Sequence, residues 1–158
     1  MSIRDLSNLT TRALDGAAFF TQRLAPFLTR IVLGEAFVFT GLGKWRNFGN
    51  TVDFFASLGL PLPAANAAMV ATIELLGGAC LILGFGTRLS AALLSSTMVV
   101  ALATADRGSL FAALPPGGAS GLTEVVPFTF LLFLLWIVAA GSGPLSVDRV
   151  LARRRAAA

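Results

Sequence analysis

The sequence predicts an all-α integral membrane protein, folded as a four-helix bundle of up-down topology. The 158 residues have a mean hydropathy of +0.81, and 56% of them are hydrophobic. Only 13% are charged, against about 25% in an average soluble domain. Four spans of about 20 residues and their loops nearly exhaust the chain, so a single transmembrane domain is expected over residues 1–158.

Four apolar stretches define this bundle, at about residues 24–45, 64–85, 89–105 and 123–140. The last two are the clearest by hydropathy, because the third has no charged residue and the fourth has only Glu124, near its start. The first two stretches contain charged residues well inside their apolar runs. We therefore expect any intrinsic function to belong to the first two.

The segment between the first two stretches is too polar to cross a membrane. Phe48, Val52 and Phe55 recur there at helical spacing, before a breaker rich in glycine and proline that ends at Pro63. This pattern predicts an interfacial or partly re-entrant half-helix on the outer face, with an ordinary loop as the alternative. Residues 106–121, rich in glycine and proline, predict a second outer loop.

Basic residues predict the orientation in the membrane. An even number of spans puts both termini and the loop around Arg88 on one face, which holds eight Arg and Lys residues against three on the other. Because cytoplasmic segments collect basic residues, segments 1–23 and 141–158 are both expected in the cytoplasm. In the C-terminal segment, Gly141 can end the fourth helix and Ser146 can cap a short surface helix.

Charged side chains within the first two stretches predict a polar pocket inside the bundle. A charge at the middle of a span costs roughly 2.5–3.5 kcal/mol, so it normally faces the interior and finds a partner. Glu35 and Glu74 fall at similar depth, Arg30 lies nearer the cytoplasm, and Arg30 is expected to pair with Glu74. With Lys44 they form a candidate site for a small polar headgroup, such as that of a quinone, or for a proton relay. The alternative is a buried ion pair that only orients the helices.

Glycines accompany these charges. Gly34 and Gly41 share one helix face with the two cations of the first stretch, at alternating steps of four and three residues. Small residues on such a face allow a neighbouring helix to approach closely. Gly77 and Gly78, one turn beyond the acid of the second stretch, offer either close packing or room for a ligand.

Several kinds of chemistry are excluded by composition. Histidine and tyrosine are absent, so haem held by histidine and the common histidine-containing metal sites are not expected. Cys80 is the single cysteine, which leaves no disulfide or Cys-x-x-Cys motif in this chain. The net charge is +4, but the basic residues are scattered, so nucleic-acid binding is not expected. No covalent cofactor and no metal is expected, and the chain is not expected to be catalytic alone.

A set of residues, each weak by itself, forms a fairly specific pattern in its order along the chain. In that order they are Arg30, Leu33, Gly34, Gly41, Lys44, Phe54, Phe55, Gly59, Pro61, Glu74, Gly77, Gly78, Leu83, Gly84, Thr87, Arg88, Gly141, Gly143, Ser146 and Asp148. The pattern resembles the DoxX family of small bacterial membrane proteins with four spans, over roughly residues 30–151.

This resemblance implies an accessory subunit of a membrane redox complex in the bacterial inner membrane, with a protein partner and a quinone as a possible noncovalent ligand. The family includes a subunit of a thiosulfate:quinone oxidoreductase and a membrane partner in oxidative-stress complexes. Two alternatives stay open: a structural or interaction protein whose charges only orient helices, and a small-solute transporter, although no inverted repeat is evident. The partner, the ligand and the oligomeric state are not defined by the sequence.

Overall fold

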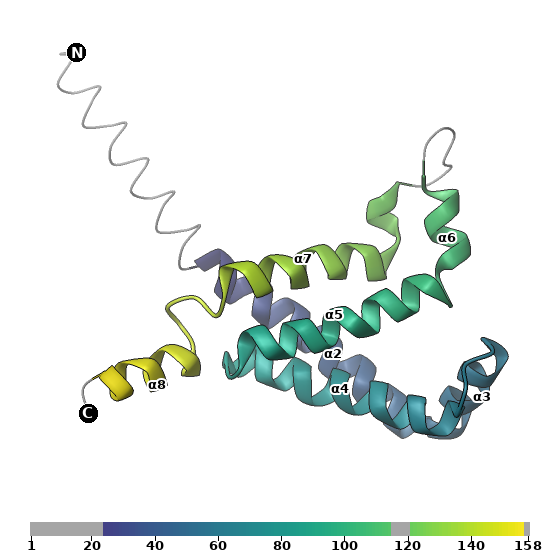
Figure 1. Ribbon diagram of the computed structural model, residues 1–158, viewed down its shortest axis with the longest axis horizontal. Coiled ribbons are helices and arrows are strands. Elements are labelled where there is room, and N and C mark those ends of the chain that lie inside the picture. The colour runs from purple at the N-terminus through teal and green to yellow at the C-terminus, as the bar shows by residue number, and fades with distance from the viewer. Residues whose placement is uncertain (1–23, 115–120, 157–158) are drawn as a thin grey trace, which may run out of the picture.

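The computed structural model describes residues 24–114 and 121–156, and within these ranges every regular element is a helix. The prediction of an all-α fold is therefore confirmed for the described part of the chain, while the predicted cytoplasmic segment 1–23 lies outside it. In chain order the elements are α2 (Ala25–Arg46), α3 (Phe48–Ser57), α4 (Pro63–Leu83), α5 (Thr87–Ala103), α6 (Arg107–Ala112), the 3₁₀ turn η2 (Leu122–Glu124), α7 (Val126–Ala140) and α8 (Val147–Ala156) (Figure 1).

Proline and glycine set the ends of the two longest helices. Pro26 lies in the first turn of α2 and Pro63 begins α4, where a missing backbone N–H costs nothing. Gly84 ends α4 in the left-handed conformation, with a φ of 67°. With 22 and 21 residues, α2 and α4 are long and apolar enough to cross a membrane. At a rise of about 1.5 Å per residue, each exceeds the ~30 Å of a hydrocarbon core.

Helices α2 and α4 run antiparallel and touch backbone to backbone. A β-carbon added at Gly34 would lie 2.7 Å from the carbonyl oxygen of Gly78, and one added at Gly41 would lie 2.8 Å from that of Ala71. A β-carbon at Gly77 would instead meet the side chain of Leu94 on α5, at 3.1 Å. Gly77 and Gly78 thus accommodate neighbouring helices and leave no room for a ligand.

The remaining apolar helices, α5 and α7, pack against each other and complete a shared core. They are shorter than α2 and α4, at 17 and 15 residues. Pro127 lies in the first turn of α7, and residues 122–124, just before the helix, form η2 rather than more of the helix. One core cluster joins all four helices (Leu33 and Phe37 from α2, Leu81 from α4, Ala91, Leu94 and Met98 from α5, Leu134 and Ile137 from α7).

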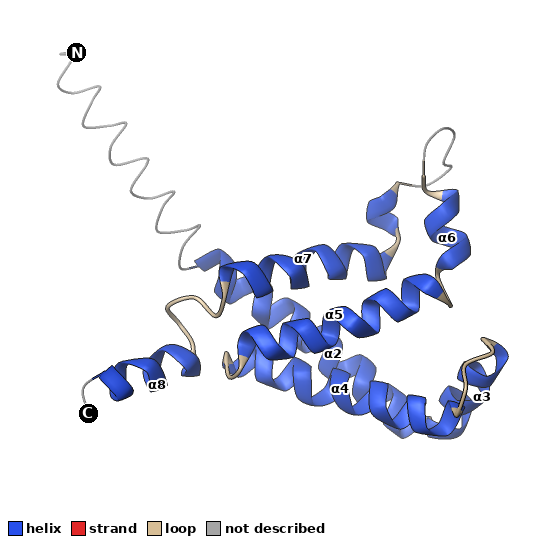
Figure 2. Cartoon of the chain, in the orientation of Figure 1, coloured by secondary structure: helices blue, strands red, loops and turns tan. Residues whose placement is uncertain are grey.

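Three short helices lie at the two ends of this core, and Figure 2 shows the loops that join them to it. Helix α3 occupies the segment for which the sequence predicted a half-helix, and it packs against α4 with Phe55 buried. Helix α6 lies in the predicted outer loop 106–121 and was not expected; residues 115–120 of that loop lie outside the described ranges. At the other end, Gly141 ends α7 and the hydroxyl of Ser146 accepts the N–H of Arg149 at 3.3 Å, as the cap prediction for α8 required.

Candidate functional site

A cavity of about 490 Å³ lies between α2, α3, α4, α5 and α7, at the end of the molecule away from α8. Its size is within the range of small-molecule sites, about 300–1,000 Å³. Most of its wall is aliphatic or aromatic, including Phe37, Phe54, Phe55, Met69, Val70, Ile73, Met98 and Phe130. We call it the α3 cavity, because α3 and the turn after it form one of its sides.

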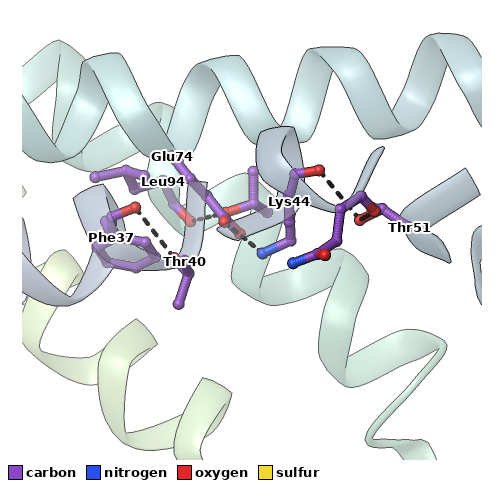
Figure 3. Close-up of polar contacts among 8 residues, drawn as sticks. Phe37, Thr40, Lys44, Thr51, Glu74 and Leu94 are labelled. Atoms are coloured by element: carbon purple, nitrogen blue, oxygen red, sulfur yellow. Dashed lines mark hydrogen bonds and ion pairs between the residues drawn. The ribbon is translucent and has the colours of Figure 1, made fainter. Parts of the chain in front are cut away.

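One ion pair supplies the polar chemistry of the α3 cavity. Lys44, in the last turn of α2, donates from Nζ to Oε2 of Glu74 at 2.5 Å, and both residues line the cavity. Figure 3 shows the two side chains pointing toward each other from neighbouring helices. The Glu74 side chain is only 5% exposed, whereas that of Lys44 is 26% exposed. The carboxylate is therefore the buried member of the pair and depends on the ammonium for its charge balance.

The other polar groups of the cavity wall are mostly engaged within their own helices. The hydroxyl of Thr40 donates to the carbonyl of Phe37 at 3.1 Å, and that of Thr97 to the carbonyl of Leu94 at 2.8 Å. Among the lining residues that the structure describes, the one other charged side chain is Asp106. A ligand in this cavity would thus meet a mainly apolar wall with an ion pair at one place.

Arg30 lies at the opposite end of α2 and does not contact Glu74. It is fully buried, and its guanidinium donates to the backbone carbonyls of Ser142 and Leu145, the second at 2.6 Å. A β-carbon at Gly84 would lie 2.6 Å from Nη1 of Arg30, so the glycine at this turn makes room for the arginine. Arg30 therefore holds the loop between α7 and α8 against the end of the core.

The expected pairing of Arg30 with Glu74 is wrong, and helix geometry explains why. With Gly34 against Gly78, the antiparallel register places Glu74 opposite residue 38, eight residues and about 12 Å along α2 from Arg30. Helical side chains also tilt toward the N-terminus of their own helix, so Arg30 points further away. The same tilt in antiparallel helices brings Lys44 and Glu74 toward each other.

Asp148, at the start of α8, completes the attachment of the C-terminal segment. Its two carboxylate oxygens accept the backbone N–H groups of Gly86 at 2.7 Å and Thr87 at 3.0 Å, and its own N–H donates to the carbonyl of Gly84 at 3.0 Å. Burial raises the pKa of Asp148, but these N–H donors and the charge of Arg30 outweigh it and hold the pKa below its ordinary value. Asp148 belonged to the family pattern, yet sequence reasoning gave it no role.

Glu35 lies on the exposed surface of α2 and is not part of the cavity wall. It follows Gly34, which packs on α4, and the step of about 100° per residue turns it off the packed face. The four candidate residues thus do not form one pocket. Lys44 and Glu74 line the α3 cavity, Arg30 holds the C-terminal loop, and Glu35 faces outward.

The fold and the comparisons agree on the class of protein. Among the described residues, two helices are long and apolar enough by length and composition to cross a bilayer, and the family match assigns the chain to a class of membrane proteins. The DoxX family matches residues 25–107, more than half of the chain. The chain belongs to the DoxX family.

Two relatives are similar to part of this chain, each over part of its own length. "Putative oxidoreductase CatD" of Bacillus subtilis (strain 168) is 35% identical over 81 residues, 51% of this chain and 59% of that protein. "Inner membrane protein YphA" of Escherichia coli (strain K12) is 34% identical over 61 residues, 39% of this chain and 44% of that protein. The chain thus spans about half the length of these curated relatives. No solved structure matches it.

Proposed function

We propose that this protein is an accessory subunit of a membrane redox complex and that its α3 cavity holds the head of a quinone beside Lys44 and Glu74. The observation that carries the proposal is an apolar cavity of about 490 Å³ with one ion pair in its wall. Membership of the DoxX family and the name of the relative CatD support the link to redox chemistry. The electrons would come from a protein partner.

In the proposed arrangement, α2, α4, α5 and α7 span the bacterial inner membrane as an up-down four-helix bundle. Helices α5 and α7 measure only about 26 and 23 Å at 1.5 Å per residue, and a locally thinned bilayer or the turns beside them would complete their spans. The excess of basic residues supports a cytoplasmic location for both termini and for α8. The α3 cavity then opens near the outer face, with α3 at the interface.

The chemistry of the cavity suits a quinone head. A quinone ring is flat and apolar on its faces, so aromatic and aliphatic walls receive it, and its carbonyl oxygens accept hydrogen bonds. The Lys44 ammonium has three N–H donors, of which the ion pair uses one. A second N–H is available to a quinone carbonyl, and the Glu74 carboxylate can accept a hydroxyl of the reduced form. The pair would therefore recognise both redox states.

The amount of quinone that co-purifies with the protein tests this proposal. We expect protein extracted in a mild detergent to retain quinone, measured by chromatography of an organic extract. Lys44→Met and Glu74→Gln should each lower the retained quinone about tenfold or more, because a hydrogen bond to a charged group contributes about 1.5–3 kcal/mol. Glu35→Gln is the matched control, since it alters an acid of α2 that faces outward. Wild-type protein without quinone, or equal retention by all variants, would overturn the proposal.

The second candidate is a structural protein that docks a partner and binds no quinone. The contacts of Arg30 favour it in part, because this buried charge holds backbone carbonyls of the chain itself and does not line the α3 cavity. On that account, Lys44→Met combined with Glu74→Leu would leave the assembly and activity of the native complex intact. On the quinone account, the same double variant would assemble with its partner but reduce quinone poorly.

A further inference from the structure

A second cavity lies at the other end of the core, where α5 begins, α7 ends and α8 begins. Its volume is about 560 Å³. Its lining includes Arg88 and Leu89 of the first turn of α5, residues 141–143 after α7, and Arg149 and Ala152 of α8. We call it the α5–α8 groove. It shares no lining residue with the α3 cavity.

The α5–α8 groove has an excess of positive charge. Its charged lining residues are Arg88, Arg149 and Asp148. Both carboxylate oxygens of Asp148 already accept backbone N–H groups at the start of α5. Arg88 donates only to the carbonyl of Ala139, at 3.4 Å, and within residues 24–114 and 121–156 neither arginine forms an ion pair. Two guanidinium groups, one from the start of α5 and one from α8, thus line the same groove and are available to an anion.

An apolar path leads out of the groove along α5. Leu89 lines the groove and is 68% exposed, and Leu93, one turn further along the same face, is 44% exposed. Phe85, just before α5, is also exposed. A free inorganic anion would gain nothing from these side chains. An anion that carries hydrocarbon chains would place them over Leu89 and Leu93 while its charge lay between the arginines.

We propose that the α5–α8 groove binds the phosphate headgroup of an anionic phospholipid. Guanidinium groups bind phosphate oxygens with paired hydrogen bonds, and basic pockets at the ends of membrane helices suit anionic headgroups. Helix α8 extends the basic surface beyond the groove, with Arg153, Arg154 and Arg155 next to the exposed side chains of Val150 and Leu151. A lipid in the groove would join α5, α7 and α8 at the membrane surface.

Lipid titration followed by native mass spectrometry tests the proposal on the purified full chain. We expect a one-to-one complex with phosphatidylglycerol that is tighter than the complex with phosphatidylcholine of the same acyl chains. Arg88→Gln and Arg149→Gln should each weaken phosphatidylglycerol binding about fivefold, because a basic residue near a lipid surface contributes ~1 kcal/mol. Arg88→Lys and Arg149→Lys should bind phosphatidylglycerol better than the glutamine variants but less tightly than the wild type, since lysine keeps the charge and loses the paired hydrogen bonds.

Controls separate this site from general attraction to lipid. Arg46, the last residue of α2, is exposed and lies at the end of the core away from the groove, so Arg46→Gln should leave phosphatidylglycerol binding unchanged. Because Arg88 and Arg149 are exposed, their glutamine variants should keep the helical circular dichroism of the wild type. Equal binding of the two lipids, or wild-type binding by the double glutamine variant, would overturn the proposal. Displacement of phosphatidylglycerol by inorganic phosphate would overturn it too, by identifying free phosphate as the ligand.

Discussion

Replacing Lys44 by methionine would leave Glu74 without a partner at a place where its side chain is only 5% exposed. Breaking a buried ion pair by removing one member typically costs about 3–5 kcal/mol, because an uncompensated charge stays buried. We expect Lys44→Met to lower the free energy of unfolding by about 3 kcal/mol, near the low end of this range. Glu74→Leu should cost less, about 1–2 kcal/mol, because Lys44 is 26% exposed and can extend toward the interface.

The double variant Lys44→Met/Glu74→Leu should recover most of this loss, since apolar residues of similar volume often replace a buried pair at little cost. Reversible unfolding in mixed micelles of detergent and dodecyl sulfate measures all four proteins in one cycle. Glu35→Gln, on the exposed face of α2, should not destabilise the protein, because a charge on the exposed face of a span is costly to keep. Equal costs for the two single variants, or additive costs in the double variant, would refute the assignment of Glu74 as the buried, dependent member.

Three further predictions concern the core and its C-terminal attachment. Gly41→Ala should destabilise the protein by about 1–3 kcal/mol in the same micelle assay, because the new β-carbon would lie 2.5 Å from a backbone nitrogen of α4. Gly43→Ala is the control: its β-carbon would meet no atom within 4 Å, so the substitution should be neutral or slightly stabilising. Arg30→Leu should free the α7–α8 loop and speed its amide hydrogen exchange, while exchange in α4 stays slow; unchanged exchange in the loop would contradict its role. Because the pKa of Asp148 is lowered in the folded protein, its stabilisation should be complete above the ordinary pKa of ~3.9 and be lost as the pH falls through the lower folded value. In Asp148→Asn, the melting temperature should therefore no longer show this loss of stability at acidic pH. A variant with the same dependence of melting temperature on pH as the wild type would count against the role of Asp148 in attaching α8.

The helices of the core could be predicted from the sequence because apolar runs and breakers leave a strong local signal. The observed α2 begins and ends one residue after the predicted 24–45 stretch, and α4 lies at 63–83 against the predicted 64–85. The helix face through Arg30, Gly34 and Gly41 was also predictable, since it depends only on spacing within one helix, and all three residues are buried.

The partners of the charges could not be predicted in the same way, because they depend on the register between helices. The sequence suggested Glu74 for Arg30 as the acid on the neighbouring span, but the glycine contacts set the register and place Lys44 beside Glu74 instead. Helix α6 was missed because Gly108 and the prolines after it resemble a loop. The sequence did not predict that α5 and α7 help to line the α3 cavity. The spacing of apolar residues shows which helix faces pack together, but it does not show where a cavity remains between them.

The most direct test of the quinone site is photolabelling of membranes that contain the native complex with a photoreactive quinone analogue. Our account predicts that labelled peptides come from the wall of the α3 cavity, on α3 and on the part of α5 around Met98, and that natural quinone competes with the label. It also predicts that Glu74→Gln lowers the labelling while Glu35→Gln does not. Labelling confined to the outer surface of α2 or to α8, or labelling of the cavity wall that natural quinone does not reduce, would contradict a quinone site in the α3 cavity.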